Sequence, residues 1–230
     1  NYFYSNHSNN NSVSAKFSSG LWCAGGNIMV SSDERIKENV VDVSDNLALE
    51  MVRDIPCRYY EYKDKYSRGT EKTIGFIAQE VNEILPSAVL IEQNIIPNEM
   101  RILTNISWEE ITDNSFKYKL TTDLSDCSGV KYRFYVSNDL SGNDETMKEV
   151  VGNSDNTFTF DTSYNNVFCY GKEIDDFHTL DKAKLFSLNF SATQELDRQQ
   201  QADKAEIAEL KTKVATLESE LAAIKQHLGI

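Results

Sequence analysis

A serine and a lysine lie five residues apart in the segment SDERIK at residues 32–37. Such a pair can act as nucleophile and general base without a histidine, provided that the lysine is a neutral amine able to take the serine proton. A free lysine has a pKa of roughly 10.4, so at pH 7 about one in a thousand or fewer is neutral. Burial disfavours an ammonium, so Ser32 and Lys37 predict a peptidase site that works only in a dry, assembled environment.

The same segment also fits an ordinary helix start. Ser32 or Asp33 is a suitable N-cap, and acidic residues follow in the first turn. Spacing alone favours this cap over catalysis, so the choice depends on the rest of the chain.

The composition is that of an acidic globular protein. The chain has 230 residues, 40% of them hydrophobic, and a formal net charge of −13, which suits one large domain or two small ones. The negative charge argues against nucleic acid as a partner. No apolar run approaches the ~20 residues that span a bilayer, so no membrane partner is expected. The start at Asn1 lacks signal-peptide features and is typical of a segment of a longer parent protein.

Four cysteines, at positions 23, 57, 127 and 169, are far apart and have no histidine cluster nearby. We therefore expect no metal site, no disulfide framework and no cofactor, but four reduced and mostly buried thiols.

Before residue 94 the pattern predicts short mixed elements. Residues 1–20 are rich in Asn and Ser and resemble a loop or the end of a repetitive β structure. The further expectations are a turn at 25–26, a strand at 28–30, a helix or strand at 33–41, a helix from the cap Ser44 to Pro56, strands at 57–62 and 73–78 (the second buried), a turn at 67–70, a helix at 79–85 and a strand at 88–91.

From about residue 94 to 172, short alternating runs such as 130–136 are separated by loops rich in Asp, Ser, Asn and Gly. This alternation predicts a small antiparallel β domain. A helical segment follows, for which Thr179 is the expected N-cap.

The end of the chain carries the clearest periodicity. Apolar residues recur at alternating steps of three and four: Ile207, Leu210, Val214, Leu217, Leu221, Ile224 and Leu228. With Ile207 at position a, the g residues and the e residues five positions further on have opposite charges, which is the pairing of a parallel coiled coil. The alternative is one amphipathic helix packed on its own domain. The residues at positions a and d are mixed and do not decide between a dimer and a trimer. Traced backwards, the same register puts Gln200 and Asp203 at core positions, where they would pack weakly.

Several motifs occur in one order. SDxRxKxN begins at Ser32, GFIAQEV spans 75–81 and precedes Leu85-Pro86, and LFxLN and ATQEL lie at 185–189 and 192–196, before the coiled coil. Together they resemble the intramolecular chaperone auto-processing domain, the S74 peptidase class, of phage and viral tail-spike and fibre proteins. The resemblance covers residues 32 to about 92 and 176–230, and leaves 94–172 as an insertion.

The resemblance implies an α+β fold: a small mixed α/β core, an inserted antiparallel β domain and a C-terminal parallel coiled-coil helix in a homotrimer. The expected domains are the end of a fibre-like parent (1–31), the auto-processing core (32–93), the insertion (94–175) and the long helix with the coiled coil (176–230). Phe76–Val81 is expected to pack the core or the trimer contact.

The resemblance also implies a mechanism. The trimer would template the folding of its client, the N-terminal parent polypeptide, in the virion or in the host cytoplasm during assembly. It would then release itself by a single-turnover cut between Ser31 and Ser32. Ser32 would be the nucleophile and Lys37 the base, with Asp33, Arg35 and Asn39 in supporting roles.

Two alternatives remain open. The chain could be a trimerisation module without proteolysis, or a receptor- or glycan-binding fibre tip whose insertion carries exposed tyrosines. For the insertion, a spacing or stabilising role is the simpler interpretation. A conventional hydrolase is disfavoured, because none of His7, His178 and His227 lies beside a nucleophile-like motif.

Overall fold

The computed structural model describes residues 30–112 and 117–229. The chain divides into two compact units, Asn1–Asp42 and Val43–Ile230. The expected loop at 1–20, the turn at 25–26 and nearly all of the strand at 28–30 lie outside the described residues. Cys23 lies outside them as well. The two units are described separately below.

The described part of the first unit is a single tight turn with extended flanks. A 3₁₀ turn, η1 (Glu34–Ile36), is the only regular element between residues 30 and 42, where a helix or a strand was expected. Asp33 is its N-cap, so one of the two cap candidates is confirmed. All side chains from 30 to 42 are exposed.

The second unit opens with short helices and a two-stranded sheet. Its first elements are α1 (Asp45–Asp54), β1 (Arg58–Tyr60), α2 (Lys65–Arg68), β2 (Thr73–Gly75), α3 (Ala78–Ile84) and η2 (Pro86–Ala88). The predicted limits of α1 are confirmed, since Ser44 precedes it and the chain leaves the helix before Pro56. The single helical turn α2 covers residues 65–68 and ends inside the turn expected at 67–70, with Gly69 as its C-cap.

The expectation of a buried strand at 73–78 is wrong. The strand is only three residues long, it pairs with β1 alone, and Ile74 is 62% exposed. A two-stranded ribbon without a second layer leaves one face in water, so the apolar run around Ile74 does not indicate burial within this chain.

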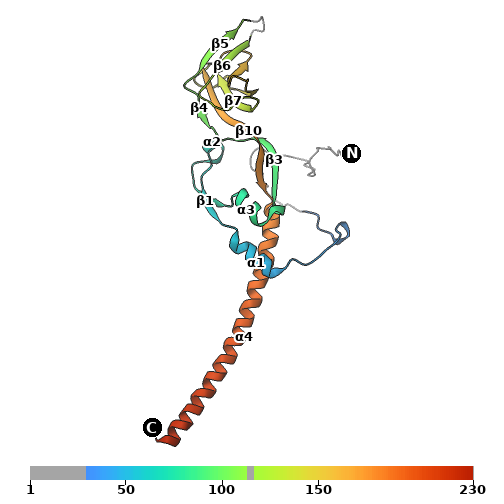
Figure 1. Ribbon diagram of the computed structural model, residues 1–230, viewed down its shortest axis with the longest axis vertical. Coiled ribbons are helices and arrows are strands. Elements are labelled where there is room, and N and C mark those ends of the chain that lie inside the picture. The colour runs from blue at the N-terminus through green and yellow to red at the C-terminus, as the bar shows by residue number, and fades with distance from the viewer. Residues whose placement is uncertain (1–29, 113–116, 230) are drawn as a thin grey trace. The chain divides into compact units, whose positions relative to one another are not determined.

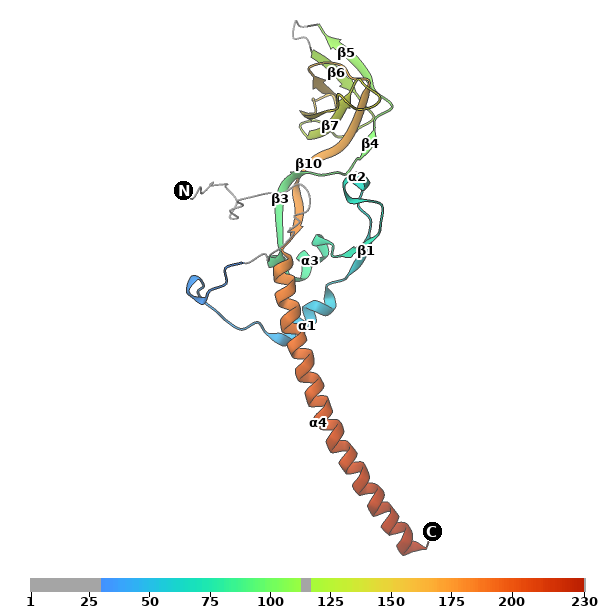
Figure 2. The ribbon, with the colours of Figure 1, turned by 180° about the vertical axis from the view of Figure 1, so that it is seen from behind.

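A small helical core joins the first part of this unit to its last helix. Leu49 of α1, Val81 of α3 and Leu188 of α4 (Lys182–Leu228) are buried together, with Ala48, Ile55, Ala88 and Ala192 completing the cluster. Figures 1 and 2 show α1 lying along the beginning of α4. The helix α1, which follows the first unit in the chain, thereby packs on the C-terminal helix α4.

All paired β-strands of the second unit are antiparallel. The remaining strands are β3 (Val89–Ile95), β4 (Arg101–Ile102), β5 (Ser107–Ile111), β6 (Lys117–Thr121), β7 (Lys131–Ser137), β8 (Thr146–Val151), β9 (Phe158–Phe160) and β10 (Asn166–Leu180). They form one sheet in the order β3-β10-β7-β8, with β4 also on β10, and a second sheet in the order β5-β6-β9. The predicted α+β class is confirmed.

The strand β10 connects the sheet to the helical core. Its first part pairs with β7 and β4, and its last part pairs with β3 down to Leu180 opposite Val89 (Figure 1). The strands β3 and β10 therefore run through the expected domain limits at 93/94 and 175/176. Those limits stay a prediction.

The insertion has an aromatic core of its own. Phe134, Phe158 and Tyr132 are almost fully buried and contact one another, and the Phe134 and Phe158 ring centroids lie 4.9 Å apart in an edge-to-face pair. Cys127 and Cys169 are buried in the same cluster, whereas Cys57 is exposed. Rings of this size supply a large apolar area, so the insertion has a hydrophobic core separate from the helical one.

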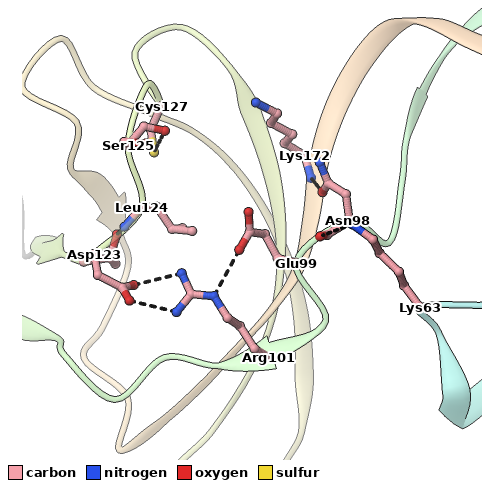
Figure 3. A network of polar contacts seen from close by, with 10 residues as sticks. Lys63, Asn98, Glu99, Arg101, Asp123, Leu124, Ser125, Cys127 and Lys172 are labelled. Atoms are coloured by element: carbon pink, nitrogen blue, oxygen red, sulfur yellow. Dashed lines mark hydrogen bonds and ion pairs between the residues drawn. The ribbon is translucent and has the colours of Figure 1, made fainter.

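A crowded crossing fixes the middle of β10 (Figure 3). Asn98 Oδ1 accepts from the Lys172 amide at 3.1 Å, and Arg101 binds Asp123 through two nitrogens and Glu99 through a third. The hydrogen bonds to Asp123, and to a smaller extent the one to Glu99, raise the pKa of Arg101 above its ordinary value. A Cβ at Gly171 would lie 1.9 Å from the carbonyl oxygen of Ile96, so only glycine fits there.

The long helix α4 begins two residues later than expected. Residues 177–180 pair with β3 as strand, and Asp181, not Thr179, is the N-cap, because its side chain accepts from the amides of Ala183 and Lys184. Beyond Glu195 none of the described residues of α4 is buried. Figures 1 and 2 show no other described element beside this later part.

Gly171→Ala should lower the free energy of unfolding by about 3 kcal/mol or more, because the new methyl group overlaps a backbone oxygen at a positive φ. Gly142→Ala is the matched control: its φ is also positive but nothing lies within 4 Å, so about 1–2 kcal/mol is expected. Urea unfolding followed by Trp108 fluorescence in a Trp22→Phe background measures both. Equal losses would contradict the crowding at Gly171.

Candidate active site

The turn η1 brings Ser32 and Lys37 together. The Lys37 amide donates to the Glu34 carbonyl at 3.0 Å, and the Ile36 amide donates to the Asp33 carbonyl at 3.2 Å. This curls the chain so that the Lys37 Nζ and Ser32 Oγ atoms lie 2.7 Å apart. A spacing of five residues thus produces a direct contact.

The direction of this hydrogen bond matters for the chemistry. A lysine ammonium has three N–H donors and no lone pair, so here the amine donates to the hydroxyl oxygen. A general base must do the reverse and accept the hydroxyl proton. Both side chains are exposed to water, which favours the charged ammonium. The two side chains are thus in contact, and their roles as nucleophile and base stay predictions.

Asp33 and Arg35 pair with each other and not with Ser32 or Lys37. The carboxylate of Asp33 binds the Arg35 guanidinium through Nε at 2.9 Å and Nη2 at 2.7 Å, and accepts from the Arg35 amide at 2.8 Å. The side-chain bonds to Arg35 hold the pKa of Asp33 below its ordinary value. These bonds stabilise the turn that joins Ser32 and Lys37, the pair predicted as the catalytic dyad.

Asn39 and Ser31 occupy the flanks of the turn. Asn39 has a φ of +53°, a left-handed conformation that asparagine tolerates better than most residues. No hydrogen bond between the Asn39 side chain and the dyad occurs within residues 30–42. Ser31, on the other side, is exposed to solvent. The roles predicted for Asn39 and for the Ser31–Ser32 bond stay predictions.

Three backbone donors in and beside the turn are already in use. The amides of Arg35, Ile36 and Lys37 each donate within η1 or to Asp33. They are therefore not available to stabilise an oxyanion in this arrangement. The backbone around the expected turn at 25–26 lies outside the described residues.

Within the part of the chain that the structure describes, no cluster of three or more His, Cys, Asp or Glu side chains is placed to hold a metal ion. No described helix has both the length and the apolar character needed to cross a membrane. His178 lies on β10, with its Nδ1 2.6 Å from the carbonyl oxygen of Asp176.

Residues 32–90 match the model of the family Peptidase_S74, described as chaperone of endosialidase. The resemblance drawn from the sequence is confirmed. The match implies an intramolecular chaperone, and for the family a self-cleaving peptidase in general. It begins at Ser32 and ends in β3, and so includes the dyad and the two-stranded ribbon.

The chain is also similar to a viral protein. It is 30% identical over 249 aligned residues to the uncharacterized protein VP1 of Micromonas pusilla reovirus (isolate Netherlands/2005). The aligned part covers 88% of this chain but 13% of that protein, so the chain spans a small fraction of its relative's length. The similarity includes most of the insertion as well as the family segment, and it supports a viral context.

The predicted oligomer seam lies on one uninterrupted helix. Its seven side chains, from Ile207 to Leu228, are 49–62% exposed in the single chain. Position a of the same register, traced backwards, falls on Phe186, which is also exposed. The helix therefore does not bury the seam on its own domain, which was the alternative to a coiled coil.

Sequence reasoning missed a polar clamp between α1 and α4. Asp45, the first residue of α1, accepts from the Ser191 hydroxyl and from the Arg198 guanidinium, and Arg198 also binds the nearly buried Glu195 at 2.7 Å. Ser191 and Arg198 are seven residues apart and so share one helix face, which was the available signal. Their common partner, more than 140 residues away, had none.

The clamp should give a pH-dependent stability. The bonds from Ser191 and then Arg198 lower the folded-state pKa of Asp45. A lowered carboxyl pKa stabilises the fold above the unfolded value of about 3.9, and the contribution is lost as the pH falls through the lower folded value. Asp45→Asn should therefore reduce the thermal midpoint by a few degrees between pH 7 and pH 5. The difference from the unmodified chain should shrink below about pH 4.

Asp42→Asn serves as the control, because Asp42 is exposed and precedes the second unit. Circular dichroism melts of the three chains at several pH values test the expectation. If Asp45→Asn and the unmodified chain differed equally at pH 7 and pH 3, the clamp would not depend on the ionised carboxylate.

Proposed function

We propose that this chain is an intramolecular chaperone that assembles a viral fibre- or spike-type parent as a trimer and then releases itself by cleavage between Ser31 and Ser32. One observation carries the proposal: the Lys37 Nζ and Ser32 Oγ atoms lie 2.7 Å apart at the first residue of the family match. The N-cap of η1 is Asp33 and not Ser32. Ser32 is therefore not needed as a cap and is free for chemistry.

The cleavage reaction uses only groups of this segment. The neutral amine of Lys37 takes the proton of Ser32 Oγ, which attacks the carbonyl carbon of Ser31. The bond between that carbon and the Ser32 nitrogen breaks, the proton passes from Lys37 to the leaving nitrogen, and an ester links Ser31 to Ser32 Oγ. Water then hydrolyses the ester and leaves a carboxylate on Ser31. The substrate is already attached, so proximity can supply on the order of 7 kcal/mol or more.

Assembly is the proposed trigger. In the single chain the pair is exposed, which favours the ammonium. Enclosing Lys37 between subunits removes water and favours the neutral amine that the reaction needs. Cleavage would then follow folding of the client and not precede it.

The assembly itself is proposed to run through α4. Seven half-exposed apolar side chains form a continuous seam, and burying them removes a large apolar area from water. The g residues Glu206, Lys213 and Glu220 face e′ residues of opposite charge, Lys211, Glu218 and Lys225, in a parallel arrangement. The trimeric number is inferred from the family resemblance.

The proposal also covers the domain boundaries and the place where the process occurs. Residues 1–31 are the end of the parent, 32–93 the auto-processing core, 94–175 an insertion and 176–230 the helix with the coiled coil. The client is the polypeptide N-terminal to Ser32, and the process takes place in the virion or in the host cytoplasm during assembly. The viral relative supports this setting.

Cleavage is tested by intact mass under denaturing conditions. The unmodified chain should give two fragments that part after Ser31, and Ser32→Ala and Lys37→Ala should stay whole. Lys37→Arg is the sharper variant, because arginine keeps the charge and the donors but cannot act as a base. It should remain at least about a thousandfold slower. Ser31→Ala, which leaves the nucleophile in place, should still cleave.

Cleavage of Lys37→Arg at the normal rate would remove Lys37 as the base. An unmodified chain that forms an oligomer yet stays whole would replace the proposal by a trimerisation module without proteolysis.

Assembly is tested by sedimentation of the uncleaved Ser32→Ala chain. Leu217→Glu places a charge in the seam and should convert trimers to monomers, whereas Ala215→Glu, two residues away on the outer face, should not. In chains that keep Ser32, Leu217→Glu should also abolish cleavage. Cleavage by a monomeric Leu217→Glu chain would separate the reaction from assembly and refute the trigger.

A further inference from the structure

A hollow of about 410 Å³ lies between the α2 segment and the strands β7 and β10. Four aromatic side chains, two carboxylates, a serine and a methionine line it: Tyr66, Tyr135, Phe168, Tyr170, Asp64, Glu145, Ser67 and Met100. Its volume is in the range of small-molecule sites. All lining residues belong to the second unit, and neither the dyad nor the seam contributes to it.

The aromatic rings form a continuous wall. The Tyr66 and Phe168 centroids are 6.1 Å apart at 84°, Tyr135 and Phe168 are 6.4 Å apart, and Tyr135 and Tyr170 are 6.1 Å apart. The α2 side is held to the sheet by Lys63, whose Nζ donates to the Asn98 carbonyl at 3.3 Å (Figure 3). Tyr66 is nevertheless 85% exposed, so most of its ring is open to solvent.

The charges of the lining are all negative. Asp64 uses Oδ1 to accept from the Ser67 amide as cap of α2. Among the described residues, neither Asp64 nor Glu145 forms an ion pair. Two guanidinium groups close to the lining already have partners: Arg133 binds Glu149 at 2.7 Å and covers the Tyr170 ring at 5.2 Å, and Arg68 lies over Tyr62 at 5.3 Å. The lining thus has carboxylates to receive a cation and no basic side chain to repel it.

We propose that this pocket binds a quaternary ammonium group of the choline type. Aromatic faces attract cations, most strongly weakly hydrated ones that lose little on leaving water. The two carboxylates add attraction and exclude anions such as acidic sugars. The pocket would give the insertion a binding role that is independent of cleavage.

The test is calorimetric titration of choline chloride into the full, uncleaved Ser32→Ala chain, so that failure of autoproteolysis cannot alter the result. We expect saturable binding, at least tenfold tighter than for 3,3-dimethylbutan-1-ol, which has the shape of choline without its charge. Tyr66→Ala and Glu145→Gln should each weaken binding roughly 3- to 30-fold. Tyr66 is chosen because its exposure makes the substitution safe for folding.

Two matched controls lie outside the pocket. Tyr59→Ala removes an exposed ring of β1 and Glu110→Gln an exposed carboxylate of β5, and both should leave the affinity unchanged. Equal affinity for choline and its neutral analogue would reduce the site to a plain apolar hollow and overturn the proposal. So would absence of saturable choline binding, or tighter binding of a neutral sugar such as glucose.

Discussion

The apolar seam of α4 is a surface that the chain cannot bury by itself. Half of each side chain from Ile207 to Leu228 meets water, although the same helix buries Leu188 and Ala192 in the helical core. Water disfavours such a stripe, and a helix this long gains little from its own packing once it leaves the core. The proposed assembly with other copies of the chain would cover this stripe. The proposed chemistry has the same need, because Lys37 must lose both its water and its charge before it can act as a base.

The clamp between α1 and α4 relates these two needs. Asp45 is held to Ser191 and Arg198, and it follows Lys37 by eight residues in the chain. Eight extended residues reach at most about 28 Å, so Lys37 can lie no further than this from Asp45. A short tether of this kind limits how far the segment with Ser32 and Lys37 can lie from α1 along the chain. The proposed order of events, assembly first and cleavage second, rests on the desolvation of Lys37.

The local signals in the sequence were reliable and the long-range ones were not. Ser44, Pro56 and Pro86 bound the helices they were expected to bound, and the contact of Ser32 with Lys37 follows from five residues of chain. The start of α4 was misjudged because Thr179 is paired with Leu90, a partner 89 residues away that overrides local capping preference. The exposure of Ile74 was missed for a similar reason, since an apolar run does not reveal whether a second layer covers it. The clamp at Asp45 and the hollow around Tyr66 depend on such distant pairings alone.

The insertion enters and leaves the fold at one place. Val89 is paired with Leu180 and Leu90 with Thr179, so the first and last residues of the strands that carry it are direct neighbours. The helical core therefore contacts only the paired ends of β3 and β10, whatever segment lies between them. The entropic cost of closing that segment grows only slowly with its length. A place where the entering and leaving chain ends are paired tolerates the insertion of different domains. One β module could be exchanged for another while the helical core stayed unchanged.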